Sequence, residues 1–337
     1  MPHAPENPRL LVFDCHEAWV HQLRVLDQPM DVVVGLPGRH THGWDEAMRP
    51  VPPNARIIRL AEALSSPAAY DCVVAHNLSD LLDAKPILAP RLFVIHATLD
   101  GIALEQSSRT PPAELRAAVH QYVKLIGAHV MAVSHLKGKS WGFDDDVVPF
   151  SADPRDYLPY RGDLSAGLRI ANDVARKKNV LLWEFHERAF AALPVTLVGR
   201  NDELAGVSPA RDWQSLKEIL SRHRFYIHTA DPRFEDGYNM ATLEAMAAGL
   251  PVLGNRHPGS PVEHALSGFL SDDPAELARF ARLLLDDPAL AARMGREAQR
   301  AVAAKFSPEC FKRGLERSLE RARKKFRRLS AHTTPRG

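Results

Sequence analysis

Two acidic side chains flank a predicted helix start in the second half of the chain. Residues 225–253 read FYIHTADPRFEDGYNMATLEAMAAGLPVL, which predicts a buried strand, a polar loop and a helix beginning near Asn239. The free amides and the dipole of such a helix start favour an anion. Asp236 precedes the helix and Glu244 stands eight positions later. Because carboxylates repel phosphate, we expect both to accept hydrogen bonds from hydroxyl groups on either side of it.

This arrangement suits a nucleotide-sugar. The amides of Asn239, Met240 and Ala241 would bind the diphosphate, while the two acids would bind a sugar at one end and a ribose at the other. A purely structural interpretation stays open, in which the first acid satisfies the helix dipole and the second forms a salt bridge. Gly249 followed by Pro251 predicts where the helix ends.

The same segment resembles the E-x7-E signature of the retaining glycosyltransferases of glycosyltransferase family 4, which have the GT-B fold. The run 236–252 matches that signature, and so does the later stretch 263–270. The resemblance implies that Asp236 binds donor-sugar hydroxyls in a catalytic role and that Glu244 binds the ribose. One departure is that the first acid is aspartate; the adjacent Glu235 could serve in its place.

Two histidines in the first half each follow a buried apolar run. His76 follows residues 70–75 and His96 follows residues 92–95. Ligand sites of open α/β sheets lie at such carboxyl ends of strands. The resemblance implies that His96 faces the donor sugar and is catalytic. We expect His76 to position the backbone or the acceptor, and we place His16 with it on the acceptor side. A surface or capping role is the alternative for each strand-end histidine.

Basic residues near the start of the second domain are candidates for binding the diphosphate. The resemblance implies a Gly-Arg pair and a later lysine that neutralise the departing group. Lys178 aligns with the lysine and Arg176 could assist, but Asn172 occupies the arginine position. A solvated basic helix start is the alternative. The first domain also lacks the family's glycine-rich loop and has residues 14–19, DCHEAW, instead.

These residues must be positioned by a recurring pattern of strands and helices. Continuous apolar runs alternate with helical stretches, which predicts parallel sheets buried on both faces. The predicted fold is α/β, with two doubly wound, Rossmann-like domains facing a cleft as in GT-B proteins. The N-terminal acceptor-side domain should span 1–157, the nucleotide-sugar-binding domain 158–306, and a basic helix and tail packing back toward the first domain 307–337. The predicted strands are 10–13, 32–34, 57–60, 72–75, 92–95, 130–133, 147–150, 168–170, 195–198, 225–228 and 252–253, with helices at 112–123 and 180–192.

Composition and missing motifs narrow the function further. The 337 residues suffice for two domains, and a net charge of +2 gives no global field that would favour nucleic acid as a partner. Three scattered cysteines without a C-x-x-C pair argue against a disulfide framework or a cysteine zinc site. The fingerprints of dinucleotide-binding dehydrogenases, P-loop ATPases, H-E-x-x-H metalloproteases and G-x-S-x-G hydrolases are absent.

We expect no metal and no cofactor. The triplet 144–146, DDD, could hold a divalent cation beside a diphosphate, but it is more typical of a polar turn before a strand. The loop 39–44, RHTHGW, could line the acceptor side or merely connect two elements. The N-terminus lacks a secretory signal, and no apolar run reaches the ~18 residues of a membrane span, which predicts a cytoplasmic protein. The basic amphipathic stretch 312–328 could contact an anionic membrane or acceptor.

The expected function is a hexosyltransferase-like, retaining transfer of sugar from a nucleotide-sugar to a glycan, lipid or small-molecule acceptor. Metal independence is part of this expectation, because a helix dipole and basic side chains can stabilise the leaving diphosphate. Retention is implied by the resemblance alone. A different class of function is a GT-B-like protein that binds a nucleotide-sugar or glycan without turnover, as the altered glycine loop, arginine and first glutamate suggest. A sugar-nucleotide epimerase of the same fold is a third interpretation.

Overall fold

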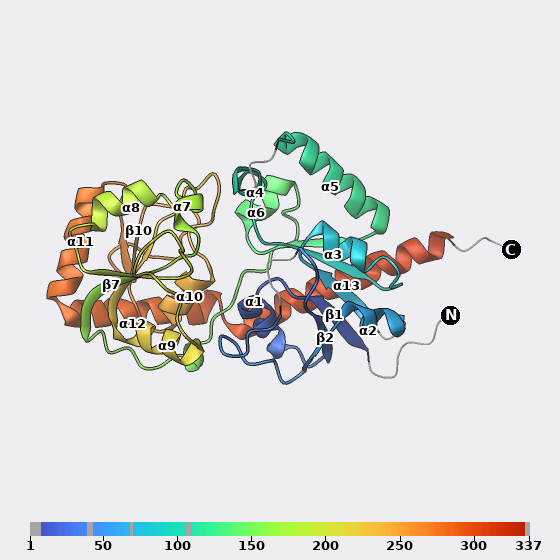
Figure 1. The fold of residues 1–337 in the computed structure, drawn as a ribbon, viewed down its shortest axis with the longest axis horizontal. Coiled ribbons are helices and arrows are strands. Elements are labelled where there is room, and N and C mark those ends of the chain that lie inside the picture. Colours follow the sequence, from blue (N-terminus) through green and yellow to red (C-terminus); the bar gives the residue numbers. More distant parts are fainter. Residues whose placement is uncertain (1–7, 39–42, 68–69, 106–108, 334–337) are drawn as a thin grey trace. The chain divides into compact units, whose positions relative to one another are not determined.

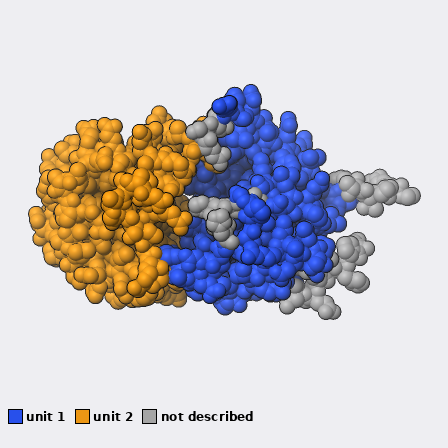
Figure 2. Space-filling view, viewed as in Figure 1, with its two compact units in different colours: residues 1–99, 109–149, 311–337 blue, residues 100–108, 150–310 orange. Residues whose placement is uncertain are grey.

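The computed structural model describes residues 8–38, 43–67, 70–105 and 109–333, which form parts of two compact units (Figures 1 and 2). Unit 1 comprises Met1–Leu99, Arg109–Pro149 and Phe311–Gly337, and unit 2 comprises Asp100–Ser108 and Phe150–Cys310. The N-terminal segment inspected for a secretory signal is described only from residue 8 onward. Residues 39–42 of the histidine-containing loop likewise lie outside the described residues.

Unit 1 contains a six-stranded parallel sheet in the order β3-β2-β1-β4-β5-β6. Strands β1, β2 and β5 are almost wholly buried, which explains their continuous apolar sequences, whereas only one residue of the edge strand β3 is buried. Leu11, Phe13 and Val73 belong to its core. The elements are β1 (Arg9–Phe13), α1 (Glu17–Gln22), β2 (Met30–Val33), β3 (Ala55–Ile58), α2 (Leu60–Ser65), β4 (Tyr70–Ala75), α3 (Leu78–Asp83), β5 (Arg91–Ile95), α5 (Pro112–Ile126), β6 (His129–Ala132), α6 (His135–Trp141) and α13 (Pro308–Thr333). Helix α4 (Leu99–Glu105) belongs to unit 2 except for its first residue.

Unit 2 contains a five-stranded parallel sheet in the order β11-β10-β9-β7-β8. Every residue of the central strand β9 is buried, and its Phe225 and Ile227 pack into a core that helices α8, α11 and α12 share. The elements are β7 (Leu164–Ile170), α7 (Val174–Lys177), α8 (Trp183–Phe190), β8 (Val195–Val198), α9 (Trp213–Arg222), β9 (His223–His228), α10 (Met240–Ala247), β10 (Val252–Gly254), β11 (Gly268–Leu270), α11 (Pro274–Asp286) and α12 (Pro288–Lys305).

The predicted fold class, two doubly wound parallel-sheet domains, is confirmed. The predicted strand 195–198 coincides with β8, but 147–150 is not a strand. There Val147 forms only an isolated bridge with Ala132, because the chain then leaves the sheet edge toward unit 2. The helix predicted at 180–192 begins later, at Trp183, because Leu182 takes a left-handed conformation with φ 48°.

Helix α13 packs its apolar face on unit 1. Phe311, Leu315 and Leu319 are buried, and Arg323 forms an ion pair with Asp71 at the end of the same face. This face is therefore occupied by the protein itself rather than exposed for insertion into a lipid surface. Across the described residues, no helix combines the length and apolar character that a membrane span requires.

The acidic triplet forms a bend, and its last member is structural. Asp146 is buried, its Oδ2 lies 2.6 Å from His129 Nε2, and Arg321 approaches within 3.2 Å. Burial works against the charge of Asp146, but hydrogen bonds from His129 and Ser318 outweigh it and lower the pKa of this carboxyl group. Asp146 is thus committed to contacts within unit 1.

Candidate functional site

The helix start predicted at Asn239 is present at the carboxyl edge of the unit 2 sheet. Helix α10 begins at Met240, and the Asn239 side chain accepts a hydrogen bond from the Thr242 amide at 2.9 Å. The Asn239 amide donates in turn to Thr242 Oγ1 at 3.3 Å, which completes a capping box. Asn239 therefore fixes the start of the helix, and its own amide already has an acceptor.

Both predicted acids are buried on either side of this cap. Asp236 exposes 3% of its surface and Glu244 exposes 8%. Burial raises the pKa of the Tyr226 phenol and the nearby charge of Glu244 adds to that rise, which places Glu244 close to β9. Buried carboxylates are stable only where hydrogen bonds or a ligand compensate them. The pair is therefore suited to accept hydrogen bonds from hydroxyl groups.

Two histidines that the sequence analysis missed hold the loop before α10. His228, the last residue of β9, donates from Nε2 to the Asp236 carbonyl at 3.2 Å, and His257 donates to the Glu235 carbonyl at 3.0 Å. Burial lowers the pKa of His228 to about 4 and also lowers that of His257, so both rings are neutral near pH 7. Their position just at or after strand ends was the available signal.

Gly237 is required by the close packing of the same loop. A β-carbon at this position would lie 2.5 Å from the Ser260 nitrogen and 2.7 Å from His257 Nδ1. Real β-carbons do not approach other atoms so closely, so the loop can pass here only with glycine. The backbone that carries Asp236 is consequently positioned by contacts on two sides.

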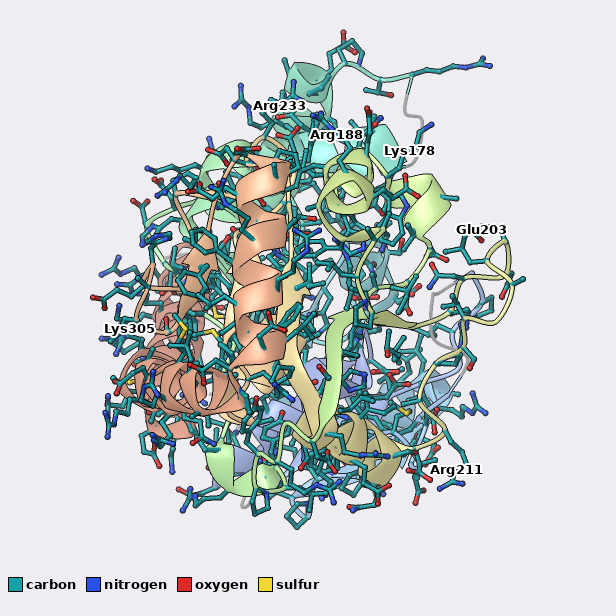
Figure 3. All side chains as sticks on the ribbon, turned by 90° about the vertical axis from the view of Figure 1, so that its left-hand side faces the viewer. Lys178, Arg188, Glu203, Arg211, Arg233 and Lys305 are labelled. Carbon is teal, nitrogen blue, oxygen red and sulfur yellow. The ribbon has the colours of Figure 1, made fainter. Side chains whose placement is uncertain are left out.

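Lys178, predicted to bind the diphosphate, is exposed and lines a hollow of about 440 Å³. Arg188 and Arg233 line the same hollow, together with the Trp183 ring, and Figure 3 shows the three basic residues at one end of unit 2. Neither of the two buried acids lines it. The hollow is therefore separate from the two acids, and its Arg233 is paired with Asp231 at 2.6 Å.

Arg176, the second basic residue predicted there, is engaged by carboxylates. Its guanidinium lies 2.9 Å from Asp173 and 3.2 Å from Glu105. The hydrogen bond to Asp173 is the main reason that the pKa of Arg176 is raised. A diphosphate would have to compete with both acids for this side chain.

The loop between β7 and α7 forms hydrogen bonds with the segment that follows β8. Asn172, at the position of the expected arginine, accepts from the Arg200 amide at 2.8 Å. The first amides of α7 donate to the side chains of Asn201 at 2.9 Å and Glu203 at 3.1 Å. The start of α7 is thus saturated by protein groups.

A buried arginine connects the loop that follows β7 with the loop that follows β9. Arg169 is 2% exposed, donates to Thr229 Oγ1 at 2.8 Å and to the Leu181 carbonyl at 3.0 Å, and lies 5.1 Å above the Trp183 ring. Burial lowers the pKa of Arg169 to about 10, so it stays charged at neutral pH. It ties the loops after the neighbouring strands β7 and β9 together and was not singled out in the sequence.

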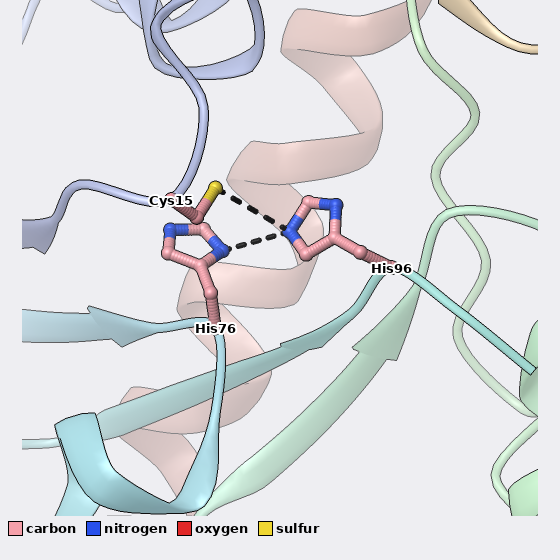
Figure 4. A group of neighbouring side chains, drawn as sticks. All are labelled: Cys15, His76 and His96. Carbon is pink, nitrogen blue, oxygen red and sulfur yellow. Dashed lines mark hydrogen bonds between the residues drawn. The ribbon is translucent and has the colours of Figure 1, made fainter. Parts of the chain in front are cut away.

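The first-half histidines meet at the carboxyl edge of the unit 1 sheet (Figure 4). His76 Nδ1 and His96 Nε2 are 2.8 Å apart, and Cys15 Sγ lies 3.9 Å from the same His96 nitrogen. The Trp19 ring packs edge-on against both imidazoles, with centroids 4.7 and 5.3 Å away. The three polar side chains follow β4, β5 and β1, which are neighbours in the sheet.

Burial sets the charge of this cluster. It lowers the pKa of His76 to about 3 and, aided by the charge of His76, lowers that of His96 well below its usual range. Burial and the neighbouring Asp14 raise the pKa of the Cys15 thiol. All three groups are therefore neutral near pH 7. His16, predicted on the acceptor side, is exposed at the start of α1, where its charge contributes slightly to the effect on His96.

Comparison with known proteins matches the second half of the chain most directly. Residues 176–310 match the profile of the family described as glycosyl transferase-like. D-inositol 3-phosphate glycosyltransferase of Streptomyces avermitilis is 44% identical over 84 residues, which are 24% of this chain and 17% of that protein. The match thus spans only a small part of that relative.

Solved structures match nearly the whole chain. HepE of Anabaena, crystallised with UDP and glucose, aligns with a TM-score of 0.66 at 14% identity and covers 93% of this chain and 100% of its own. Sucrose-phosphate synthase of Thermosynechococcus elongatus aligns with a TM-score of 0.61 at 16% identity, covering 97% and 100%. The chain therefore has the GT-B fold of glycosyltransferases. Its second half is glycosyltransferase-like in sequence.

Proposed function

We propose that this protein is a glycosyltransferase that moves a sugar from a nucleotide-sugar to an acceptor. The observation that carries the proposal is the α10 site, where buried Asp236 and Glu244 flank a capped helix start. The dipole of α10 favours the diphosphate, and the acids accept hydrogen bonds from hydroxyls at both ends of the donor. Relatives crystallised with UDP and UDP-glucose support this class of donor.

The finer assignment follows the resemblance to glycosyltransferase family 4. It gives a retaining, hexosyltransferase-like reaction without a metal at the diphosphate, where Lys178 and the α10 amides neutralise charge instead. Asp236 contacts the donor sugar and Glu244 the ribose. His96 is the catalytic residue contributed by unit 1, and His16 and His76 belong to the acceptor side. The acceptor is a glycan, a lipid or a small molecule.

A second candidate is a protein that binds the donor without turning it over. The specific observation in its favour is the β7–α7 loop, which has Asn172 in place of an arginine and amides already bonded to Asn201 and Glu203. The engagement of Arg176 by Asp173 and Glu105 points the same way. Such a loop offers less positive charge to a leaving diphosphate than an active enzyme requires.

One screen separates the two candidates. The full chain is incubated with UDP-, GDP- and ADP-sugars, and both thermal stabilisation and nucleotide release are measured. A transferase shows stabilisation by one donor and release that increases with a suitable acceptor. Stabilisation without release under any acceptor supports the binding protein. If no donor stabilises the chain and Glu244→Ala behaves like wild type, the α10 site does not bind a nucleotide-sugar.

For location, we propose a cytoplasmic protein with peripheral contact to an anionic membrane. The apolar face of α13 is used within unit 1, so the contact would rely on its outward-facing basic residues. Arg313, Arg317 and Lys324 are exposed there. Sedimentation with phosphatidylserine vesicles, compared with neutral vesicles, tests this contact; equal sedimentation in both would contradict it.

A further inference from the structure

The cluster of Cys15, His76 and His96 has the composition and geometry of a metal-binding site. A thiol and two imidazoles converge from three neighbouring strands of unit 1, and their donor atoms lie within 4.8 Å of one another (Figure 4). Such a donor set, one sulfur and two imidazole nitrogens, matches thiophilic ions such as zinc. The strand order of the unit 1 sheet brings the three groups together, because each of them follows one of three neighbouring strands.

The distances are close to those that zinc imposes. A tetrahedral ion bonded at its usual lengths keeps two nitrogens about 3.3 Å apart, and a nitrogen and a sulfur about 3.6 Å apart. His76 Nδ1 and His96 Nε2 are 2.8 Å apart, while Cys15 Sγ and His96 Nε2 are 3.9 Å apart. To hold the ion, the two nitrogens would have to separate by about 0.5 Å, and Cys15 Sγ and His96 Nε2 would have to approach by about 0.3 Å. Cys15 Sγ and His76 Nδ1 lie within 4.8 Å of each other. The Trp19 ring, packed edge-on against both imidazoles, already holds them near this orientation.

The residues around Cys15, His76 and His96 carry more negative than positive charge. On the thiol side, Asp14, Asp80 and Glu17 lie near enough to act on Cys15, and Asp14 and Asp80 are themselves buried. On the opposite side, Lys137 and His16 act on His96. Three carboxylates against one lysine and one exposed histidine leave a field that favours a bound cation over three neutral ligands.

We infer that Cys15 Sγ, His76 Nδ1 and His96 Nε2 bind one Zn²⁺ ion, with a fourth position open to water or another ligand. Binding needs the Cys15 thiolate, so the thiol proton is released to solvent. It also needs a lone pair on His76 Nδ1 and on His96 Nε2, so the hydrogen that now lies between these atoms must move to the other nitrogen of the ring that carries it. No oxidant or reductant takes part.

This inference goes beyond the proposed transferase and does not rest on it. A zinc ion on His96 Nε2 would hold the ring that a catalytic His96 needs for contact with the donor sugar. The two uses are exclusive, so a bound ion would inhibit transfer. The tests below measure the metal itself, so a chain that transfers no sugar can still bind zinc, and the reverse.

Cobalt substitution tests the ligand set. The full chain is stripped with a chelator and titrated with Co²⁺, and absorption is recorded. We expect one equivalent to produce the thiolate-to-cobalt charge-transfer band in the near ultraviolet, and Zn²⁺ to abolish it. Cys15→Ser should remove the band, and His76→Asn should weaken binding at least about tenfold because one of three ligands is lost. Cys310→Ser and His135→Asn, a thiol and a histidine elsewhere in the chain, should leave the titration unchanged.

A measurement on the wild-type chain keeps the test independent of how the variants fold. Cys15 and Cys310 are alkylated with and without Zn²⁺, and the rate at each is followed by mass spectrometry. Zinc should slow alkylation of Cys15 at least about tenfold and leave Cys310 unaffected, because a bound thiolate is masked. Equal rates at Cys15, or a charge-transfer band that survives in Cys15→Ser, would overturn the inference.

Discussion

The carboxyl edges of the two parallel sheets, which differ in strand order, carry different chemistry. In unit 2 the edge presents buried carboxylates, a capped helix start and basic side chains. In unit 1 the corresponding edge presents a thiol and two neutral imidazoles beside Trp19. Burial on both faces restricts the strands to apolar residues, whereas the loops that follow them carry no such restriction. The first few residues after the strands therefore determine the chemistry of each unit.

A second contrast lies within unit 2. The first two amides of α7 donate to the side chains of Asn201 and Glu203, whereas at the start of α10 the cap residue Asn239 and Thr242 bond to each other. Side-chain acceptors that satisfy a helix start compete with any anionic ligand. This difference is the reason that we place the diphosphate at α10, although Lys178, which follows α7, lines the hollow.

The largest effect should come from the acids of unit 2. In the double variant Asp236→Ala/Glu244→Ala, we expect kcat/KM for nucleotide release to fall about 10³-fold, because each lost hydrogen bond to a charged group costs about 1.5–3 kcal/mol. Steady-state kinetics with the stabilising donor measure this change. Glu297→Ala, an acid on α12, is the control. Retention of more than a tenth of wild-type activity would remove the acids from the site.

The next test asks whether unit 1 contributes chemistry or only binding. For His96→Ala we expect kcat to fall about 10²-fold, as for loss of a catalytic acid or base, with unchanged thermal stabilisation by the donor. Assays are run with chelator, so that no zinc masks the wild-type ring. His135→Ala is the matched control. A loss of donor stabilisation with unchanged kcat would instead assign His96 to binding.

Gly237→Ala tests how rigidly unit 2 holds its acid. The new β-carbon would approach the Ser260 nitrogen and His257 Nδ1, and such overpacking costs about 2 kcal/mol of unfolding free energy. We also expect KM for the donor to rise, because Asp236 is the preceding residue. Urea denaturation and kinetics measure the two effects. Gly43→Ala, where no atom of the described residues lies within 4 Å of the added carbon, should change neither.

The smallest test asks whether burial keeps a further histidine of unit 2 neutral, as it does His228. In unit 2, His186 is 6% exposed and stacks on Trp183, and burial lowers its pKa to about 2. Above the unfolded-state pKa of about 6.5 the ring is neutral in both states, and the free energy of unfolding has its full value. As pH falls from about 6.5 toward the pKa of the folded state, protons bind the unfolded state more readily, and the free energy of unfolding decreases. The slope is about 1.4 kcal/mol per pH unit.

For His186→Leu we therefore expect the loss of unfolding free energy between pH 7 and pH 5 to be about 2 kcal/mol smaller than in wild type. Denaturant titrations at the two pH values measure the difference. His135→Leu, at an exposed position, is the control. An unchanged pH dependence in His186→Leu would show that this ring does not stay neutral on folding.

Much of the fold could be predicted from sequence, and so could the helix start at the carboxyl edge of the unit 2 sheet. The strand at 195–198 and the cap at Asn239 depend on local patterns, apolar runs and a capping residue before a helix, which act over a few positions. His228 and His257 escaped prediction because their partners are backbone carbonyls eight and 22 positions away. Such contacts leave no periodic trace in the chain.

Local sequence alone determined the parallel-sheet class, because continuous apolar runs with helices between them have few other ways to be buried. It also determined the α10 segment, in which acids, cap and helix lie within a dozen residues. Only the tertiary structure decided that Cys15 meets His96, 81 positions away, and that His76 lies beside it. The reason is strand order: β1, β4 and β5 are neighbours in the sheet, and hydrogen bonding between strands, not distance along the chain, joins their carboxyl ends.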